Sequence, residues 1–293
     1  MKQNQDKIKE ALERMEQSLE SIHTNEDWLQ FLAFQSKFYH YSFRNTMLIY
    51  AQNPEASYVK GFKAWNKLGR YVKKGSKGLA ILAPCFVKVE EKESEAQEKS
   101  AKKTEEEKRV LSGFKVTYVF DIADTAGSED QLPVLVRGLS GNSEQEQELY
   151  EKLKDVIGKE HKIQEIVETA AKGWFDLTTG IIAVREDMDY LQKIKTLLHE
   201  YAHAIDFTMH PDSEEISRNK RELIAESVAF VVSSRLGLDT SAYSIGYVQS
   251  WLQDKNELKQ VADNIQKVSA TILNKLAKSS DFASFMLQED EEV

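Results

Sequence analysis

The sequence has a single cysteine and no long hydrophobic run, and each absence excludes a class of protein or site. With Cys85 alone, neither an intramolecular disulfide nor a cysteine-rich zinc site can form. No apolar run approaches the roughly 18 uncharged residues that cross a bilayer, and residues 1–10 lack the apolar stretch of a secretory signal. We therefore expect a cytoplasmic protein that makes no membrane contact and holds any metal ion through histidines and carboxylates.

What the chain does contain is an ordinary soluble composition. Of its 293 residues 41% are hydrophobic, and 39 lysines and arginines stand against 48 acidic residues, a formal net charge of -9. At roughly 150 residues per domain the length predicts about two domains, with one long domain as the alternative. The negative total does not exclude nucleic-acid binding, because the clustering of positive charge on one face decides that question.

The N-terminal part begins with patterns typical of helices. Apolar residues spaced three and four apart predict a helix over 5–22, and Thr24 provides the start signal of a second one. A third helix is predicted over 46–53 and ends before Pro54, since the residue before a proline avoids the helical region.

Two strands are predicted on either side of a highly charged segment. Residues 78–89 have the pattern of a buried strand, and residues 113–122 alternate apolar and polar positions. Between them, residues 90–110 contain eight acidic and six basic residues and almost nothing apolar, so we predict a solvated or disordered insertion. This insertion is expected to connect two strands of one sheet.

We place a linker at residues 126–146, which are rich in glycine, serine and acidic residues. It separates an N-terminal α+β domain over 1–125 from a second domain over 147–293. For the second domain the pattern predicts a helix, a hairpin over 174–186 and further helices, including a C-terminal helical extension over 248–276. The predicted fold class is therefore α+β, with a mostly helical C-terminal domain that carries a small sheet.

The most informative motif is H-E-x-x-H, formed by His199, Glu200 and His203. On a helix, residues four apart share a face, so both imidazoles can bind one Zn2+. Glu200 is then placed to take a proton from a water that the ion has acidified. The motif predicts metal-assisted hydrolysis with Glu200 as the catalytic base.

A catalytic zinc site needs a third protein ligand, and two glutamates are candidates. Glu222 and Glu226 lie four apart on one predicted helix face, the first of them nineteen residues beyond His203. We assign Glu222 as the ligand and Glu226 as the group that hydrogen-bonds and orients a ligand histidine, with the swapped assignment as the alternative. Asp206, three residues after His203, is a further candidate for the orienting role.

The alternative without a metal is that the histidines are polar residues at a core edge and the glutamates a solvated helix face. It accounts less well for the sequence, because Glu222 and Glu226 flank the apolar residues 223–225 and precede Val228 and Ala229. Carboxylates within a largely apolar helix require a partner.

The strand-like residues 180–186 precede the H-E-x-x-H helix. Peptidases of this kind commonly hold their substrate as an added strand along a sheet edge, so these residues are a candidate edge. A plain structural hairpin is an alternative of equal weight.

Positive charge does cluster, between residues 52 and 78. Seven basic residues there stand against one acid, Glu55, and aromatic residues are interleaved with them. Basic residues that track phosphates, mixed with rings on which bases stack, are what sequence-tolerant binding of single strands needs. The alternative, of equal weight, is that the rings belong to the core and the lysines to an ordinary solvated face. The candidate DNA-contacting residues, two of them upstream of the cluster, are Arg44, Asn45, Lys60, Lys63, Trp65, Lys67, Arg70, Tyr71, Lys73, Lys74 and Lys77.

Two motif sets resemble one known family. Residues 20–125, above all YSFRNTMLIYAQNP, GFKAWNKLGRYVKKGSKG and VTYVFDIADT, are similar to the N-terminal domain of ArdC-type antirestriction proteins. The segments HEYAHAIDF and ELIAESVAF resemble the zincin-like metallopeptidase domain that follows it in that family. The resemblance covers most of the chain, whereas the charged insertion and the C-terminal extension depart from the family's pattern.

The resemblance implies single-stranded DNA binding by the N-terminal domain and a zinc metallopeptidase-like second domain. It makes His199, His203 and Glu222 the metal ligands and Glu200 the catalytic base. It also implies a protein of a mobile genetic element, such as a conjugative plasmid, that accompanies incoming single-stranded DNA and counters host defence.

We therefore expect an antirestriction protein that binds single-stranded DNA and whose zinc-dependent domain cleaves a host or element-encoded protein. One alternative is a pure single-strand-binding protein with a structural or vestigial zinc site. Another is a soluble metallopeptidase that cleaves a regulator and whose basic cluster is incidental. Mn2+ or another divalent ion also suits two imidazoles and one carboxylate.

Overall fold

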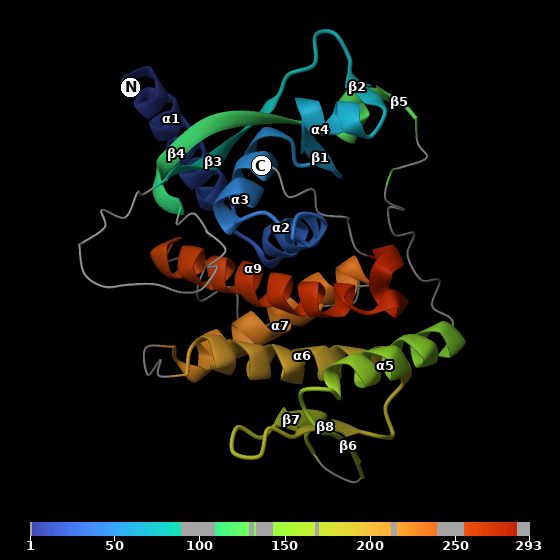
Figure 1. The fold of residues 1–293 in the computed structure, drawn as a ribbon. Coiled ribbons are helices and arrows are strands. Elements are labelled where there is room, and N and C mark those ends of the chain that lie inside the picture. The colour runs from blue at the N-terminus through green and yellow to red at the C-terminus, as the bar shows by residue number, and fades with distance from the viewer. Residues whose placement is uncertain are drawn as a thin grey trace, which may run out of the picture.

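The computed structural model describes residues 2–88, 109–128, 132, 143–167, 170–211, 216–238 and 255–285. Helices dominate, and small sheets lie at two opposite ends of the molecule (Figure 1). This arrangement confirms the α+β class predicted from the sequence.

The N-terminal part contains most of the strands. Its helices are α1 (Lys2–Glu20), α2 (Asn25–Lys37), α3 (Phe43–Gln52) and α4 (Phe62–Lys67), with a 3-10 turn at Ile122–Asp124, and its strands are β1 (Val59–Gly61), β2 (Arg70–Val72), β3 (Leu79–Lys88), β4 (Arg109–Asp121) and β5 (Thr125–Gly127).

The rest of the chain is mostly helical. It contains α5 (Ser143–Ile157), β6 (Ile163–Ile166), β7 (Gly173–Phe175), β8 (Ile182–Arg185), α6 (Tyr190–Met209), α7 (Arg218–Arg235), α9 (Lys255–Ala277) and a 3-10 helix at Ser280–Phe285. Within the described residues, no helix is both long and apolar enough to cross a membrane.

The start of α2 follows from its sequence. The Thr24 side chain accepts a hydrogen bond from the backbone N–H of Asp27 (3.1 Å), and the Asp27 carboxylate accepts one from the backbone N–H of Thr24 (2.9 Å). This reciprocal pair satisfies two N–H groups that the first turn of a helix leaves without partners. The start signal read at Thr24 is therefore confirmed.

The predicted connection between two strands of one sheet is confirmed. Strand β4 pairs antiparallel with β3 over the whole length of β3, and with β1 on its other side. A register shift between Cys85 and Phe86 interrupts the ladder once. Most of the predicted charged insertion, residues 90–108, lies outside the described residues.

The hairpin predicted over 174–186 is present, but its second strand is not a sheet edge. Strand β8 lies between β7, to which it is antiparallel, and β6, to which it is parallel. Both of its edges are therefore occupied, and the prediction that residues 180–186 offer a free edge to a peptide is wrong. Reading the hairpin locally could not reveal the parallel partner β6.

The two halves of the sequence share one hydrophobic core. Helix α9 packs against α1 and α3 of the N-terminal part and against α6 and α7, while α2 packs directly on α7 (Figure 1). One continuous cluster of buried residues includes members of α1, α2, α3, α5, α6, α7 and α9. Within it the Trp28 indole donates to the Ser227 hydroxyl (3.4 Å). The Gln266 amide nitrogen lies 3.2, 3.0 and 2.8 Å from the carbonyl oxygens of Phe38, Tyr39 and Tyr41.

The predicted linker, residues 126–146, is structured at both of its ends. Its first residues belong to β5, which pairs with β2, and its last belong to α5, which begins at Ser143. Residues 129–131 and 133–142 lie outside the described residues. The predicted C-terminal helix over 248–276 corresponds to α9, and residues before Lys255 in that prediction also lie outside the described part.

Candidate metal centre and basic surface

Helix α6 presents both motif histidines toward α7. Asp189 caps its start by accepting a hydrogen bond from the backbone N–H of Gln192 (2.8 Å). The other faces of α6 are fixed by burial of Ile194, Leu197, Leu198, Tyr201, Ala204 and Ile205. Packing on these faces sets the rotation of the helix and thereby the direction of the two imidazoles.

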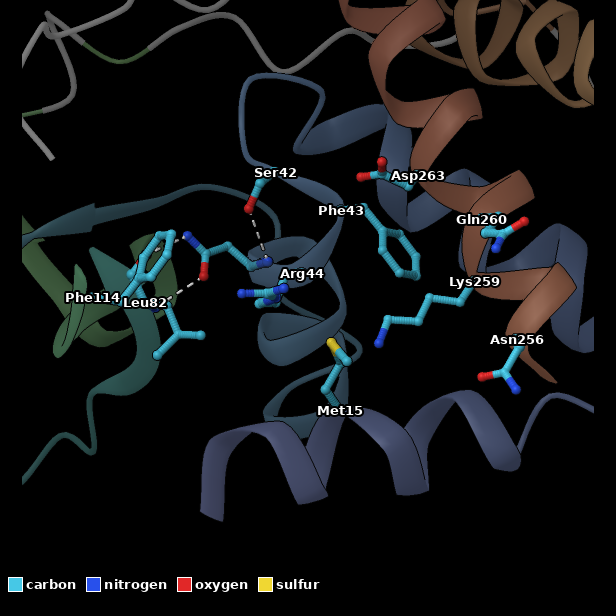
Figure 2. Close-up of a pocket in the computed structure, with 11 residues that line it drawn as sticks. Met15, Ser42, Phe43, Arg44, Leu82, Phe114, Asn256, Lys259, Gln260 and Asp263 are labelled. Carbon is cyan, nitrogen blue, oxygen red and sulfur yellow. Dashed lines mark hydrogen bonds between the residues drawn. The ribbon is translucent and has the colours of Figure 1, made fainter. Parts of the chain in front are cut away.

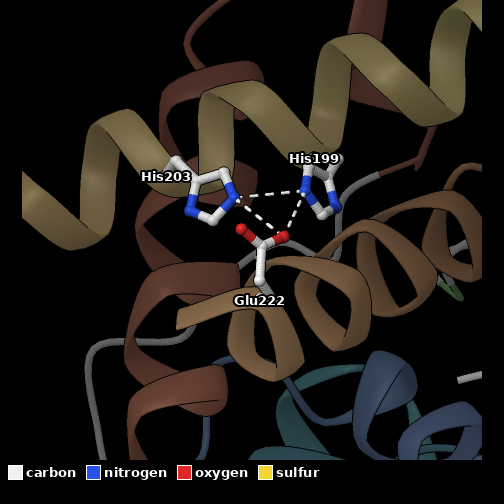
Figure 3. A group of neighbouring side chains, drawn as sticks. All are labelled: His199, His203 and Glu222. Atoms are coloured by element: carbon white, nitrogen blue, oxygen red, sulfur yellow. Dashed lines mark hydrogen bonds and ion pairs between the residues drawn. The ribbon is translucent and has the colours of Figure 1, made fainter. Parts of the chain in front are cut away.

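His199, His203 and Glu222 form a compact triangle of ligand atoms (Figure 3). The Nε2 atoms of His199 and His203 lie 3.1 Å apart. Oε2 of Glu222 lies 3.4 Å from Nε2 of His199 and 3.6 Å from Nε2 of His203. The glutamate comes from α7, which packs against α6, so two helices build the site.

This triangle has the size that a tetrahedral divalent ion requires. Ligands at 2.0–2.1 Å from a tetrahedral ion stand about 3.4 Å from one another. The three separations fall on both sides of that value. Two imidazoles and a carboxylate are donors suited to Zn2+ and also to Mn2+. The residues present therefore fit a divalent ion.

The two residues predicted to orient a ligand histidine lie in different surroundings. Oε1 of Glu226 is 3.5 Å from Nδ1 of His199, on the side of the ring away from Glu222. Asp206 is buried and turned to Arg221, at 2.6 Å, and to His210, at 3.1 Å. We therefore keep Glu226 as the group that orients His199 and do not carry Asp206 forward in that role.

Glu200 is buried beside the triangle. The residue is only 8% exposed, and strand β7 packs over it. Gly173 of β7 lies so close that a methyl group at this position would contact Thr196 and the Glu200 side chain. Burial raises the pKa of the Glu200 carboxyl, and the imidazoles of His199 and His203 only partly oppose this. A raised pKa brings a carboxylate closer to the strength that a general base needs near neutral pH.

The proposed ligand carboxylate has the opposite shift. Hydrogen bonds from His199 and then His203 hold the pKa of Glu222 well below its usual range, against a smaller effect of burial. Glu222 is therefore ionised at neutral pH. Two carboxylates of one site thus have pKa values shifted in opposite directions, which is how environments divide the roles of base and ligand.

The basic cluster forms an exposed surface around α4, β2 and residues 73–78. Aromatic rings are exposed among the lysines, since Phe62 is 53% and Tyr71 60% exposed. The predicted residues with exposed side chains here are Lys63, Lys67, Tyr71, Lys73, Lys74 and Lys77, and Lys60 is half-buried against the ring of Tyr58. We call this set, with Phe62, the basic surface.

Three predicted DNA-contacting residues are instead engaged inside the fold. Trp65 is fully buried and its indole donates to the carbonyl of Phe120 (2.9 Å). Arg70 is buried and donates to Thr125 and Ser128. The Asn45 amide both donates to and accepts from the backbone of Leu82, tying α3 to β3. We leave these three out of the basic surface.

A second group of exposed rings was missed from the sequence. Phe86, Phe114 and Tyr118 on the β3–β4 hairpin are 56%, 40% and 47% exposed, and the guanidinium of Arg44 lies 5.9 Å from the Phe114 ring. The spacing of Phe114 and Tyr118 does place them on one strand face. Alternation alone predicts such an apolar face to be buried, so only the packing reveals its exposure.

Comparison with known proteins places the N-terminal part in a family. Residues 1–120 match the model of the N-terminal domain of anti-restriction factor ArdC. An uncharacterized protein of Bacillus anthracis is 26% identical over 282 residues, which cover 84% of this chain and 46% of that protein. The chain thus spans about half the length of this curated relative.

Among solved structures, the metal-free crystal structure of the antirestriction ArdC protein from the R388 plasmid is similar, with a TM-score of 0.50 and 21% identity over 81% of this chain and 86% of that one. The Mn(II)-bound structure of the same protein has a TM-score of 0.49, also at 21% identity, over 81% and 85%. At this identity the metal-free structure establishes a common fold.

Proposed function

We propose that this chain, whose N-terminal part matches the ArdC N-terminal domain, is an ArdC-type antirestriction protein that combines two activities. The first is the binding of single-stranded DNA through the basic surface. The second is the metal-dependent hydrolysis of a peptide bond in a host or element-encoded protein. Together they would protect incoming DNA of a mobile element.

The hydrolytic activity is supported above all by the triangle of His199, His203 and Glu222. Its three ligand atoms lie 3.1–3.6 Å apart, close to the spacing around a tetrahedral ion. A divalent ion bound there supplies a Lewis acid that polarises a carbonyl and lowers the pKa of water. We propose Zn2+ as the ion, with Mn2+ as the second candidate for the same donor set.

Glu200 is the proposed general base. Its carboxylate lies next to both imidazoles and has a raised pKa, so it can take a proton from water and pass it to the leaving amine. Glu226 holds Nδ1 of His199 and thereby directs Nε2 toward the site.

We propose that an extended peptide substrate binds along strand β7. This strand pairs with β8 alone among the described residues, so no other described strand occupies its other edge. A backbone hydrogen bond joins Phe175 of β7 to the carboxylate of Glu200, which places this strand beside the base. A peptide added along β7 would run past the reacting groups by strand addition.

Metal binding is tested on the intact chain after treatment with a chelator. We expect the protein to take up about one Zn2+ per chain from a dialysis buffer, measured by mass spectrometry. An ion at 100 times its dissociation constant stabilises the folded state by about 2.7 kcal/mol. For a chain of this size that corresponds to a rise of about 5 °C in Tm.

The same measurement with Mn2+ ranks the two ions, and Ca2+ serves as a control because it prefers six to eight oxygen ligands. Equal thermal shifts with all three ions, or no ion retained after dialysis, would contradict a two-histidine, one-carboxylate site.

Single-strand binding is supported by exposed lysines and rings on one part of the N-terminal surface. Removing one lysine that neutralises a phosphate lowers the slope of log K against log salt by about 0.7 for a single strand. We expect the Lys63→Gln, Lys74→Gln, Lys77→Gln variant to bind a 15-nucleotide oligothymidylate more weakly. The slope of its log K against log salt should be smaller by about 2. Fluorescence anisotropy at several salt concentrations measures both.

The control carries the same charge change elsewhere. Lys159, Lys162 and Lys278 are also exposed, and replacing them with glutamine is expected to leave the slope unchanged. A flat salt response of the native chain would remove DNA from the proposed function.

A further inference from the structure

A cavity of about 610 Å³ lies where the β3–β4 hairpin, the start of α3 and helix α9 meet (Figure 2). It is distant in sequence from the metal ligands and is not part of the basic surface. Its lining combines residues of the matched family domain with residues of α9, which lies beyond the 1–120 match. The cavity is within the size range of sites for small molecules and single nucleotides.

Two cations face this cavity. Arg44 is exposed at its rim, and Lys259 extends its ammonium group into it from α9 (Figure 2). The one carboxylate in the lining, Asp263, is held by Lys267 at 2.7 Å. Among the described residues, no carboxylate forms an ion pair with Arg44 or Lys259. The positive charge of the cavity is therefore available to an anion.

The cavity also offers a flat ring and a polar amide. Phe114 is 40% exposed with the guanidinium of Arg44 at 5.9 Å from its ring, and Gln260 extends from the same side as Lys259. Aromatic rings provide stacking surfaces for bases of any sequence, whereas amides can hydrogen-bond the edge of a base. Cations, ring and amide together match an anion that carries a planar heterocycle.

The hairpin connects this cavity to the basic surface. Phe114 and Tyr118 occupy one face of β4 and are about 13 Å apart along the strand. The backbone of Gly78 lies against Tyr118, and Gly78 directly follows Lys77, the last lysine of the basic surface. Exposed rings thus lead from the basic surface to the cavity, which favours an extended nucleic-acid strand over an isolated small anion.

We propose that this cavity binds one nucleotide of a single strand, with the base against Phe114 and the phosphate between Arg44 and Lys259. The proposal rests on the proposed binding of single-stranded DNA and assigns it a second contact point. Helix α9 then contributes directly to DNA binding, although it lies outside the family's N-terminal domain.

The test uses the full chain and a 15-nucleotide oligothymidylate. We expect Lys259→Gln to weaken binding about fivefold and to reduce the salt slope by about 0.7. Phe114→Ala is expected to weaken binding about tenfold with little change of slope, because stacking is not ionic. Lys278→Gln, an exposed lysine just beyond the same helix, is the matched control and is expected to bind as the native chain does. Thermal unfolding confirms that each variant is folded.

The outcomes separate the two proposals. If Lys259→Gln and Phe114→Ala both bind with native affinity while the Lys63, Lys74 and Lys77 variant binds more weakly, the proposed nucleotide site in the cavity is overturned. The proposed DNA binding by the basic surface then still stands. No binding by the native chain overturns both. An oligonucleotide with 5-iodouracil bases adds a direct readout, because photocrosslinking to the peptide that contains Phe114 supports the proposal and crosslinking only to residues 62–78 contradicts it.

Discussion

Replacing Glu200 by glutamine is expected to lower peptide hydrolysis by a factor of about 100 to 10,000, the usual contribution of a general base. Glutamine keeps the shape of the side chain but cannot accept a proton. Because Glu200 is buried and burial raises its pKa, an uncharged amide costs the fold little at this position. The metal content and the thermal stability of the variant should therefore equal those of the native chain.

The readout of this variant does not require a known substrate. Unmodified plasmid DNA is transferred into a restricting host that produces the native chain or the Glu200→Gln variant, and new protein N-termini in the two cultures are compared by mass spectrometry. We expect both protection and the new N-termini to disappear. Glu226→Gln is the matched control, since a group that only orients a ligand costs about 10–100-fold. Full protection by Glu200→Gln would show that DNA binding alone protects, and the proposed peptidase role would be abandoned.

The second large effect is expected from the His199→Ala, His203→Ala variant. It loses two of the three atoms in a triangle whose edges are 3.1–3.6 Å, and one carboxylate cannot hold a divalent ion against water. Bound metal should fall from about one per chain to none, and the metal-induced rise in Tm should vanish with it. Hydrolysis should be lost entirely.

DNA affinity of the same variant tests whether the two activities are separable. The exposed lysines of the basic surface belong to α4 and to residues 73–77, and the metal ligands belong to α6 and α7. We expect oligothymidylate binding to be unchanged. Retention of one ion per chain by the variant would place the metal elsewhere in the protein, and the ligand assignment would be wrong.

The grouping of His199, His203 and Glu222 was predictable because most of its geometry is local. His199 and His203 are one helical turn apart, and Glu222 and Glu226 lie on a second helix whose apolar neighbours predict burial. Only the meeting of the two helices is tertiary. The role of Asp206 could not be read in the same way, because its partner Arg221 lies fifteen residues away and competes for the carboxylate.

The exposed side chains of the basic surface were harder to predict, because an aromatic ring or a guanidinium group is equally compatible with a buried and an exposed position. Trp65 bonds the backbone of Phe120 and Arg70 bonds that of Ser128, contacts that span more than fifty residues. Phe114 has the same local pattern as a buried strand residue, yet it is exposed. Composition located the basic surface, and only long-range packing separates its exposed side chains from the buried ones.

The bonds of Gln266 to the turn after α2 bear on how the protein is made. The carbonyls of Phe38, Tyr39 and Tyr41 leave the ribosome some 225 residues before their partner does. At 5–20 residues per second that interval is on the order of tens of seconds. During it the nascent N-terminal helices lack α9, against which they pack, and their apolar faces stay open to chaperones or to aggregation. A premature stop codon before α9 would therefore yield an aggregation-prone fragment rather than a smaller functional protein.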